Sequence, residues 1–175
     1  MTEKDVRRAF EDHKDAVYNF ALRMTGSETV AEDVAQDCFL ELLRNPGGFD
    51  ETRGSLRMFL FGVTRHLVHR HWRAEQHFVS VNVSFEDDVR SYSPDPAAGS
   101  MSAMIREAVQ SLPALQREAV LLFEYEGFTL EEIATIAKVD VGTVKSRLHR
   151  ARERLRQMLA PLRNHSGVRH SGAQP

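Results

Sequence analysis

Two clusters of side chains in this sequence are suited to binding nucleic acid. The first follows Asp140, where small and hydrogen-bonding residues are interspersed with cations: Gly142, Thr143, Lys145, Ser146, Arg147, His149, Arg150, Arg152 and Arg154. At the start of a helix, such groups reach base edges in the DNA major groove while Lys and Arg bind phosphates. The pattern favours DNA recognition over its alternative, a solvated basic helix packed on a neighbour.

The second cluster is the run RHLVHRHWR, which contains Arg65, His66, His69, Arg70, His71, Trp72 and Arg73. A tryptophan ring among cations suits single-stranded DNA, because bases stack on the ring and the cations hold the phosphates. Two alternatives compete with this interpretation. Cations favour a helix C-terminus, and histidines bind metals, but no Cys follows nearby to complete a ligand set. We therefore expect neither a metal nor a cofactor.

A pair of helices joined by a tight turn must position the first cluster. Thr129 and Glu132 form a capping box, which predicts a helix from Leu130. After the short turn Lys138-Val139, Asp140 is a good N-cap for a second helix. In that helix Val144, Leu148, Ala151 and Leu155 recur at helical spacing and predict a buried stripe. The spacing predicts a helix-turn-helix.

Three earlier helices are predicted by the same periodicity. The first runs over Val6–Met24 and ends at Gly26, and the third runs from an N-cap at Ser55 to about Arg73, carrying the second cluster. Between them, Thr29 and Glu32 predict a capping box for a helix that reaches Arg44. That helix is acidic on one side and apolar on the other, so it suits either a plain surface or a protein partner.

Residues 76–103 differ from the helical segments on both sides. Val79, Val81, Val83 and Phe85 alternate with polar residues, which favours an extended segment. The acidic run Glu86–Asp88 and a Pro/Gly/Ser-rich stretch follow. We expect an all-α chain of two small domains: residues 1–75, a three-helix bundle, and residues 104–163, four helices that include the helix-turn-helix. Residues 76–103 are the linker, and residues 164–175 are a disordered tail.

Charge is distributed unevenly along the chain. The net charge of −2 divides into −6 for residues 1–52, +4 for 53–75, −5 for 76–128 and +5 for 129–175. Two basic blocks indicate two nucleic-acid surfaces, which leaves the acidic surfaces for something else. Cys38 is the single cysteine and is expected in the core. No signal-peptide pattern or membrane-length apolar stretch occurs, so we expect a cytoplasmic protein without a membrane partner.

The C-terminal half resembles region 4 of the extracytoplasmic-function (ECF) sigma factors of bacterial RNA polymerase, through the run SLPALQREAVLLFEYEGFTLEEIATIAKVDVGTVKSRLHRARERLR. The segment GTVKSRLHRAR is among the most specific signatures of that family. Residues from about 10 to 75 resemble region 2, through AEDVAQDCFLELLR and SLRMFLFGVTRHLVHRHWR. Three positions differ from the usual family pattern, which often has Asn at His66, an acidic residue at Arg70 and Gly at Lys138.

The resemblance implies a subunit without catalytic chemistry that directs core polymerase to promoters. Region 4 would bind the β flap and read the minus-thirty-five element through Thr143, Lys145, Ser146, Arg147, His149 and Arg150. Region 2 would open the minus-ten element with Arg65, His66, His69, Arg70, Trp72 and Arg73. It would bind the β′ clamp helices with Asp33, Gln36, Asp37 and Phe39. An anti-sigma factor is an expected partner, and the free chain is expected to be a monomer.

Two other classes of function are open from the residues alone. A stand-alone helix-turn-helix regulator that binds operator DNA accounts for residues 129–156 but gives the first basic block and the acidic linker no role. An enzyme built on the histidine cluster lacks a nucleophile–base pair, a phosphate-binding Gly loop and a complete ligand set.

Overall fold

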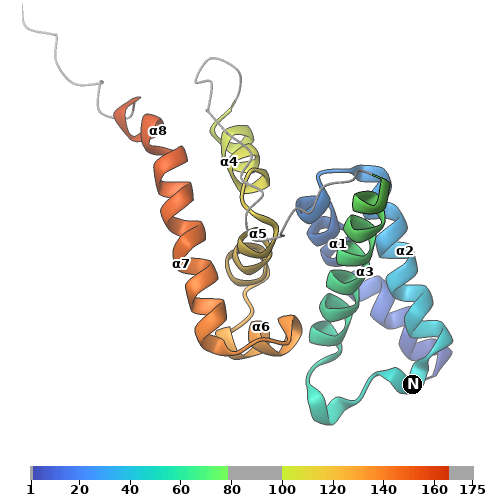
Figure 1. Ribbon diagram of the computed structural model, residues 1–175. Coiled ribbons are helices and arrows are strands. Elements are labelled where there is room, and N and C mark those ends of the chain that lie inside the picture. The colour runs from blue at the N-terminus through green and yellow to red at the C-terminus, as the bar shows by residue number, and fades with distance from the viewer. Residues whose placement is uncertain (1, 79–99, 166–175) are drawn as a thin grey trace, which may run out of the picture.

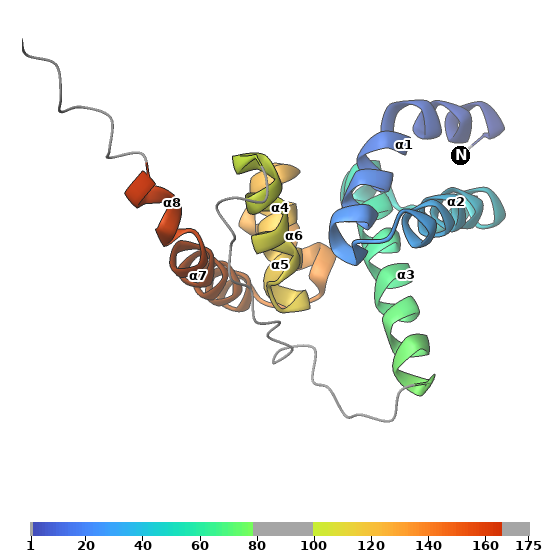
Figure 2. The same ribbon diagram turned by 90° about the horizontal axis from the view of Figure 1, so that it is seen from above.

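The computed structural model describes residues 2–78 and 100–165, and within these ranges every regular element is helical. The first region holds α1 (Glu3–Thr25), α2 (Glu28–Arg44) and α3 (Leu56–Phe78), with two short 3-10 turns at Pro46–Gly48 and Glu51–Arg53. The second holds α4 (Met101–Gln110), α5 (Ala114–Val120), a π-helical turn (Leu121–Tyr125), α6 (Leu130–Ala137), α7 (Val141–Met158) and α8 (Ala160–His165). Figures 1 and 2 show the two regions side by side. The expected all-α architecture of two helical regions is confirmed.

Most of the helix ends in the first region are where the sequence predicts them. Gly26 ends α1 in the left-handed conformation with φ of 71°, and the Ser55 hydroxyl accepts a hydrogen bond from the Met58 amide at 3.2 Å. One predicted cap is wrong. Ser27, not Thr29, caps α2, because its hydroxyl accepts the Val30 amide at 3.3 Å. The helix therefore starts one residue before Thr29.

The predicted linker limits fall inside helices at both ends. The third helix continues past Arg73 to Phe78, and α4 already begins at Met101. The predicted extended segment at Val79–Phe85 and the acidic run Glu86–Asp88 lie outside the described residues. At the C-terminus α8 reaches His165, so the first two residues of the predicted tail are helical.

Cys38 lies in the core of the first region, as predicted, with no exposed surface. Burial raises the pKa of its thiol to about 11, and the hydrogen bond from the Thr64 hydroxyl lowers it only in part. Because the thiolate is the reactive form, the folded protein should protect this cysteine at neutral pH.

We expect Cys38 to resist alkylation by iodoacetamide at pH 8 in the native protein and to react rapidly in urea. In the native state the reaction rate should rise as the pH approaches 11, where the thiolate forms. Mass spectrometry of timed samples measures both rates. Equal rates with and without urea would contradict the buried position.

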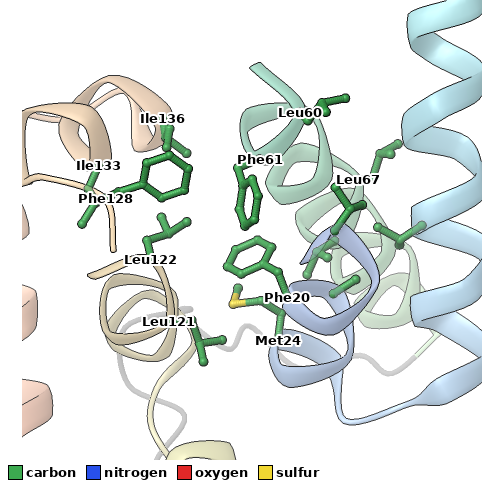
Figure 3. Packing of buried hydrophobic residues seen from close by; sticks show 14 of the residues in the cluster. Phe20, Met24, Leu60, Phe61, Leu67, Leu121, Leu122, Phe128, Ile133 and Ile136 are labelled. Carbon is green, nitrogen blue, oxygen red and sulfur yellow. The ribbon is translucent and has the colours of Figure 1, made fainter. Parts of the chain in front are cut away.

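The two regions share one continuous hydrophobic core. The ring of Phe61 from α3 lies 5.1 Å from the ring of Phe20 in α1. It also lies 5.1 Å from the ring of Phe128, which directly precedes the N-cap residue of α6. Figure 3 shows Phe20 and Phe61 facing Phe128 and Leu122 across the boundary between the regions. The sequence did not predict this contact.

Candidate nucleic-acid interface

The helix-turn-helix is positioned by the caps that the sequence predicts. The Thr129 hydroxyl accepts the Glu132 amide at 3.2 Å, and the Glu132 carboxylate accepts the Thr129 amide at 2.8 Å. At the start of α7, the Asp140 carboxylate accepts the Thr143 amide at 2.6 Å. That hydrogen bond lowers the pKa of Asp140. These contacts fix the angle at which α7 leaves the turn.

Lys138 makes this turn in the left-handed conformation, with φ of 55° and ψ of 45°. A side chain with a Cβ is disfavoured there, and glycine is not. We expect Lys138→Gly to raise the free energy of unfolding by roughly 0.5–1 kcal/mol, since relief of strain exceeds the added entropy of the unfolded chain. Urea denaturation measures the change. Lys138→Ala is the matched control, because it removes the charge and keeps the strain; an equal gain from that variant would show that backbone strain is not the cause.

The predicted minus-thirty-five residues lie on the accessible side of α7. Lys145, Ser146, His149 and Arg150 are exposed, and Thr143 and Arg147 are half-buried. The opposite side packs inward through the predicted stripe of Val144, Leu148 and Ala151, all buried, with Leu155 half-buried at its end. The structure therefore brings the six predicted residues together on one face.

Arg152 has a structural role that the sequence did not reveal. Its guanidinium donates to the Glu124 carboxylate at 2.8 Å and lies over the Phe123 ring, 5.3 Å from the centroid. Both partners belong to the π-helical turn after α5. The side chain thus braces α7 on its own region and is less available for phosphate than Lys145 or Arg150.

The predicted minus-ten residues divide into two groups. His66, Arg70 and Arg73 are exposed, and Arg70 makes a 3.2 Å ion pair with Asp37, both side chains being at least half exposed. Arg65 and His69 instead point into the boundary with the second region, where both contact Glu118 of α5 at 2.8 and 2.7 Å. The Trp72 ring is half-buried and lies 5.3 Å from the His69 ring. Phe78, another aromatic residue near the end of this helix that could stack on a base, has a side chain outside the described residues.

A groove of about 810 Å³ runs along this part of α3. Its walls come from the end of α2, from the segment 45–55, from α3 and from the end of α6. Its cations are Arg53, Arg65, Arg70, Arg73 and Lys138, which outnumber its two carboxylates, Glu41 and Asp50. His66 also lines it, and partial burial together with the charges of Arg73 and Arg70 lowers the pKa of this histidine. A neutral imidazole keeps one nitrogen as an acceptor. Such a groove can hold an anionic strand.

Glu118 is a buried residue beside the candidate minus-ten residues that the sequence did not predict. Its side chain is only 2% exposed, yet the sequence places it in an ordinary amphipathic helix, where an acidic residue is expected to face solvent. Burial raises the pKa of Glu118, but the His69 hydrogen bond and the Arg65 charge outweigh burial, so the pKa is lowered overall. The carboxylate is therefore ionised in the core.

The candidate polymerase-binding residues on α2 do not all share one environment. Asp33, Gln36 and Asp37 are exposed along the helix. Phe39 is 6% exposed, and its ring packs edge to face on Phe10 at 5.0 Å. The ring of Phe10, itself 41% exposed, therefore covers the position from which Phe39 was expected to contact a partner.

In residues 2–78 and 100–165, no three His, Cys, Asp or Glu side chains are grouped so that they could hold a metal ion. None of the helices in the described ranges combines the length and apolar character needed to cross a membrane.

Comparison with known proteins identifies the arrangement. Residues 9–78 match the family model described as Sigma-70 region 2, and residues 102–155 match the one described as Sigma-70, region 4. The chain is 30% identical over 178 residues to the ECF RNA polymerase sigma factor SigW of Bacillus subtilis, covering 93% of this chain and 95% of that one. This chain belongs to the ECF family of RNA polymerase sigma factors. As a sigma factor, it serves promoter-specific initiation of transcription by RNA polymerase.

Other relatives agree with this membership. The sigma factor is 33% identical to SigE of Mycolicibacterium smegmatis over 85% of its own length, but it spans only 59% of that relative. It is 30% identical to SigL of Mycobacterium tuberculosis, with 90% of each chain covered. Among solved structures it resembles the sigma factor RpoE of Bartonella quintana, described in complex with the anti-sigma factor NepR, with a TM-score of 0.73, 28% identity and 90% of this chain covered.

Proposed function

We propose that this sigma factor holds a promoter at two places, with α7 on the minus-thirty-five element and the basic part of α3 on the minus-ten element. The observation that carries the proposal is the accessible face of α7, where Lys145, Ser146, His149 and Arg150 are exposed beside a rigidly capped turn. A recognition helix needs this combination of a fixed entry angle and free polar side chains.

Within α7 the side chains divide by chemistry. Lys145 and Arg147 would bind phosphates and set the register of the helix, which carries no sequence information by itself. Ser146, His149 and Arg150 would contact base edges, where a bidentate arginine–guanine pair contributes about 1–3 kcal/mol of discrimination. Arg152 is left out of the phosphate-binding set, because its guanidinium already forms an ion pair with Glu124.

In the first region, the groove along α3 would take the opened minus-ten strand. Arg70, Arg73 and Lys138 line it and supply phosphate contacts, and Trp72 offers a ring for stacking. Arg65 and His69 would also contact the strand once the Glu118 side chain moves away from them.

The remaining acidic surfaces are assigned to proteins. Asp33, Gln36 and Asp37 on α2 would contact the β′ clamp helices of core polymerase, and region 4 would contact the β flap. The linker carboxylates of Glu86–Asp88 would enter the polymerase cleft. An anti-sigma factor is a further partner, supported by the Bartonella quintana relative, whose structure was determined with NepR. The chain acts in the cytoplasm and supplies no catalytic group, since core polymerase performs the phosphoryl transfer.

The test is run-off transcription with purified core polymerase and fragmented genomic DNA, with and without this chain. New transcripts whose start sites share two upstream elements are the expected result. No promoter-specific transcript would refute the proposal. Tight binding to a duplex in the absence of polymerase would instead support the stand-alone regulator, which leaves the groove along α3 without a role.

A further inference from the structure

The boundary between the two regions contains a buried ionic contact. Both oxygens of the Glu118 carboxylate on α5 are used: Arg65 Nε donates to one at 2.8 Å, and His69 Nε2 is 2.7 Å from the other. The glutamate is 2% exposed, the arginine 18% and the histidine 14%. A carboxylate of the second region thus contacts two side chains of the first region that are candidates for holding promoter DNA.

A second contact closes the other end of the same boundary. The Arg57 guanidinium on α3 donates to the Glu126 carbonyl oxygen at 2.7 Å and to its carboxylate at 3.0 Å. The same group lies 4.1 Å from the centre of the Phe128 ring and 5.1 Å from that of Phe61. Arg117 of α5 also donates to the Met24 carbonyl oxygen at the end of α1. Polar contacts therefore flank the apolar boundary of Figure 3.

The packed arrangement is too small to hold both promoter elements at once. A compact chain of this length measures roughly 40 Å across. Elements centred about 25 base pairs apart are separated by roughly 85 Å at 3.4 Å per base pair. The two regions must therefore separate before α3 and α7 reach their elements together.

We propose that the contact of Glu118 with Arg65 and His69 is an autoinhibitory latch, in which a carboxylate of region 4 occupies two side chains that region 2 needs for the minus-ten strand. The latch rests on the proposed assignment of α3 and α7 to DNA. It requires no inhibitor protein: the chain itself competes with nucleic acid for the same two side chains. Core polymerase and promoter DNA gain access only by displacing it.

The test measures the separation of the two regions in the full chain. Spin labels are placed on cysteines introduced by Glu32→Cys in α2 and Glu153→Cys in α7, both exposed positions outside the candidate surfaces. Cys38 stays in place, because its buried thiol does not react at neutral pH. Glu118→Gln keeps the shape of the side chain and removes its charge. We expect a single narrow distribution of label-to-label distances when Glu118 is unchanged. In Glu118→Gln we expect a second population with longer distances.

Glu124→Gln is the matched control. Glu124 is close to Glu118 in the chain and also binds an arginine, but that arginine is Arg152 of its own region. The control should keep the narrow distribution. Identical distributions for Glu118→Gln and for the unmutated chain would overturn the latch, and so would an equal opening in Glu124→Gln.

Arg65→Gln guards against misfolding of the first variant. If circular dichroism shows that Glu118→Gln has lost helix, or if Cys38 has become reactive, the second variant replaces it. Arg65 is the cationic partner of the same contact and is 18% exposed, so its loss leaves the buried Glu118 carboxylate without that ion pair and should open the boundary. A narrow, unchanged distribution in Arg65→Gln would then refute the latch.

A second measurement relates the latch to activity. In transcription with core polymerase, Glu118→Gln should reach half-maximal activity at about tenfold lower concentration, because more of the chain is already competent. An unchanged concentration would count against autoinhibition. If the unmutated chain gives no promoter-specific transcript, the proposed function fails, but the distance measurement, which needs no polymerase, still decides whether the latch exists.

Discussion

Phe61→Ala should lower the free energy of unfolding by about 3–5 kcal/mol, the largest stability effect expected from a single side chain here. The ring has no exposed surface and contacts Phe20 on one side and Phe128 on the other. Its removal leaves a cavity that two rings line from different regions, and neither can move in without losing other contacts. Urea denaturation followed by circular dichroism measures the loss.

Phe10→Ala is the control for this prediction. It removes the same kind of side chain from α1, but that ring is 41% exposed and packs edge to face on Phe39. We expect a loss of about 1 kcal/mol or less. Comparable losses for the two variants would show that Phe61 is not at the centre of the core.

Arg150→Ala should reduce promoter discrimination by about 1–3 kcal/mol, or roughly 5- to 150-fold in the ratio of preferred to altered promoters. Arg150 is exposed on the side of α7 that we propose faces DNA, and none of the polar contacts found in the described part of the chain involves its side chain. Losing a base contact lowers use of the preferred minus-thirty-five sequence without equally lowering use of a variant sequence. Competitive transcription from the two templates in one tube measures the ratio.

Arg156→Ala is the comparison for that experiment. Arg156 is an exposed arginine on the same helix, but it pairs with Glu153 at 2.7 Å and is six residues further toward the C-terminus, past the proposed recognition residues. The promoter ratio should stay within about twofold of that of the unmutated chain. An unchanged ratio in Arg150→Ala as well would remove this arginine from the recognition set.

The parts that were predictable from the sequence are those encoded locally. Thr129, Glu132 and Asp140 identify their helix starts because each cap involves residues only three positions apart. The end of α1 at Gly26 is predictable for the same reason, because it depends on the conformation of one residue. The cap at Ser27 was not predicted, because Thr29 and Glu32 also match a capping box. Local sequence patterns do not choose between two candidates only two residues apart.

The contact between the regions was not predictable in this way. Phe61, Phe128 and Glu118 are far apart in the sequence, and each fits an ordinary pattern in its own segment. Only tertiary packing places the carboxylate of Glu118 beside Arg65 and His69, which the sequence assigns to DNA. The exposed residues of α7 were predicted correctly as a face, since helical periodicity alone determines which side chains share it.

The shared core also has a consequence for folding. The aromatic contacts of Phe61 and the ion pair of Glu118 with Arg65 span the boundary between the regions, so part of the apolar surface of each region is buried only while the two are packed together. Unfolding should therefore be cooperative across the whole molecule, with one transition in place of two. A chain cut between residues 78 and 100 should still sediment as a single particle, held together without a covalent bond.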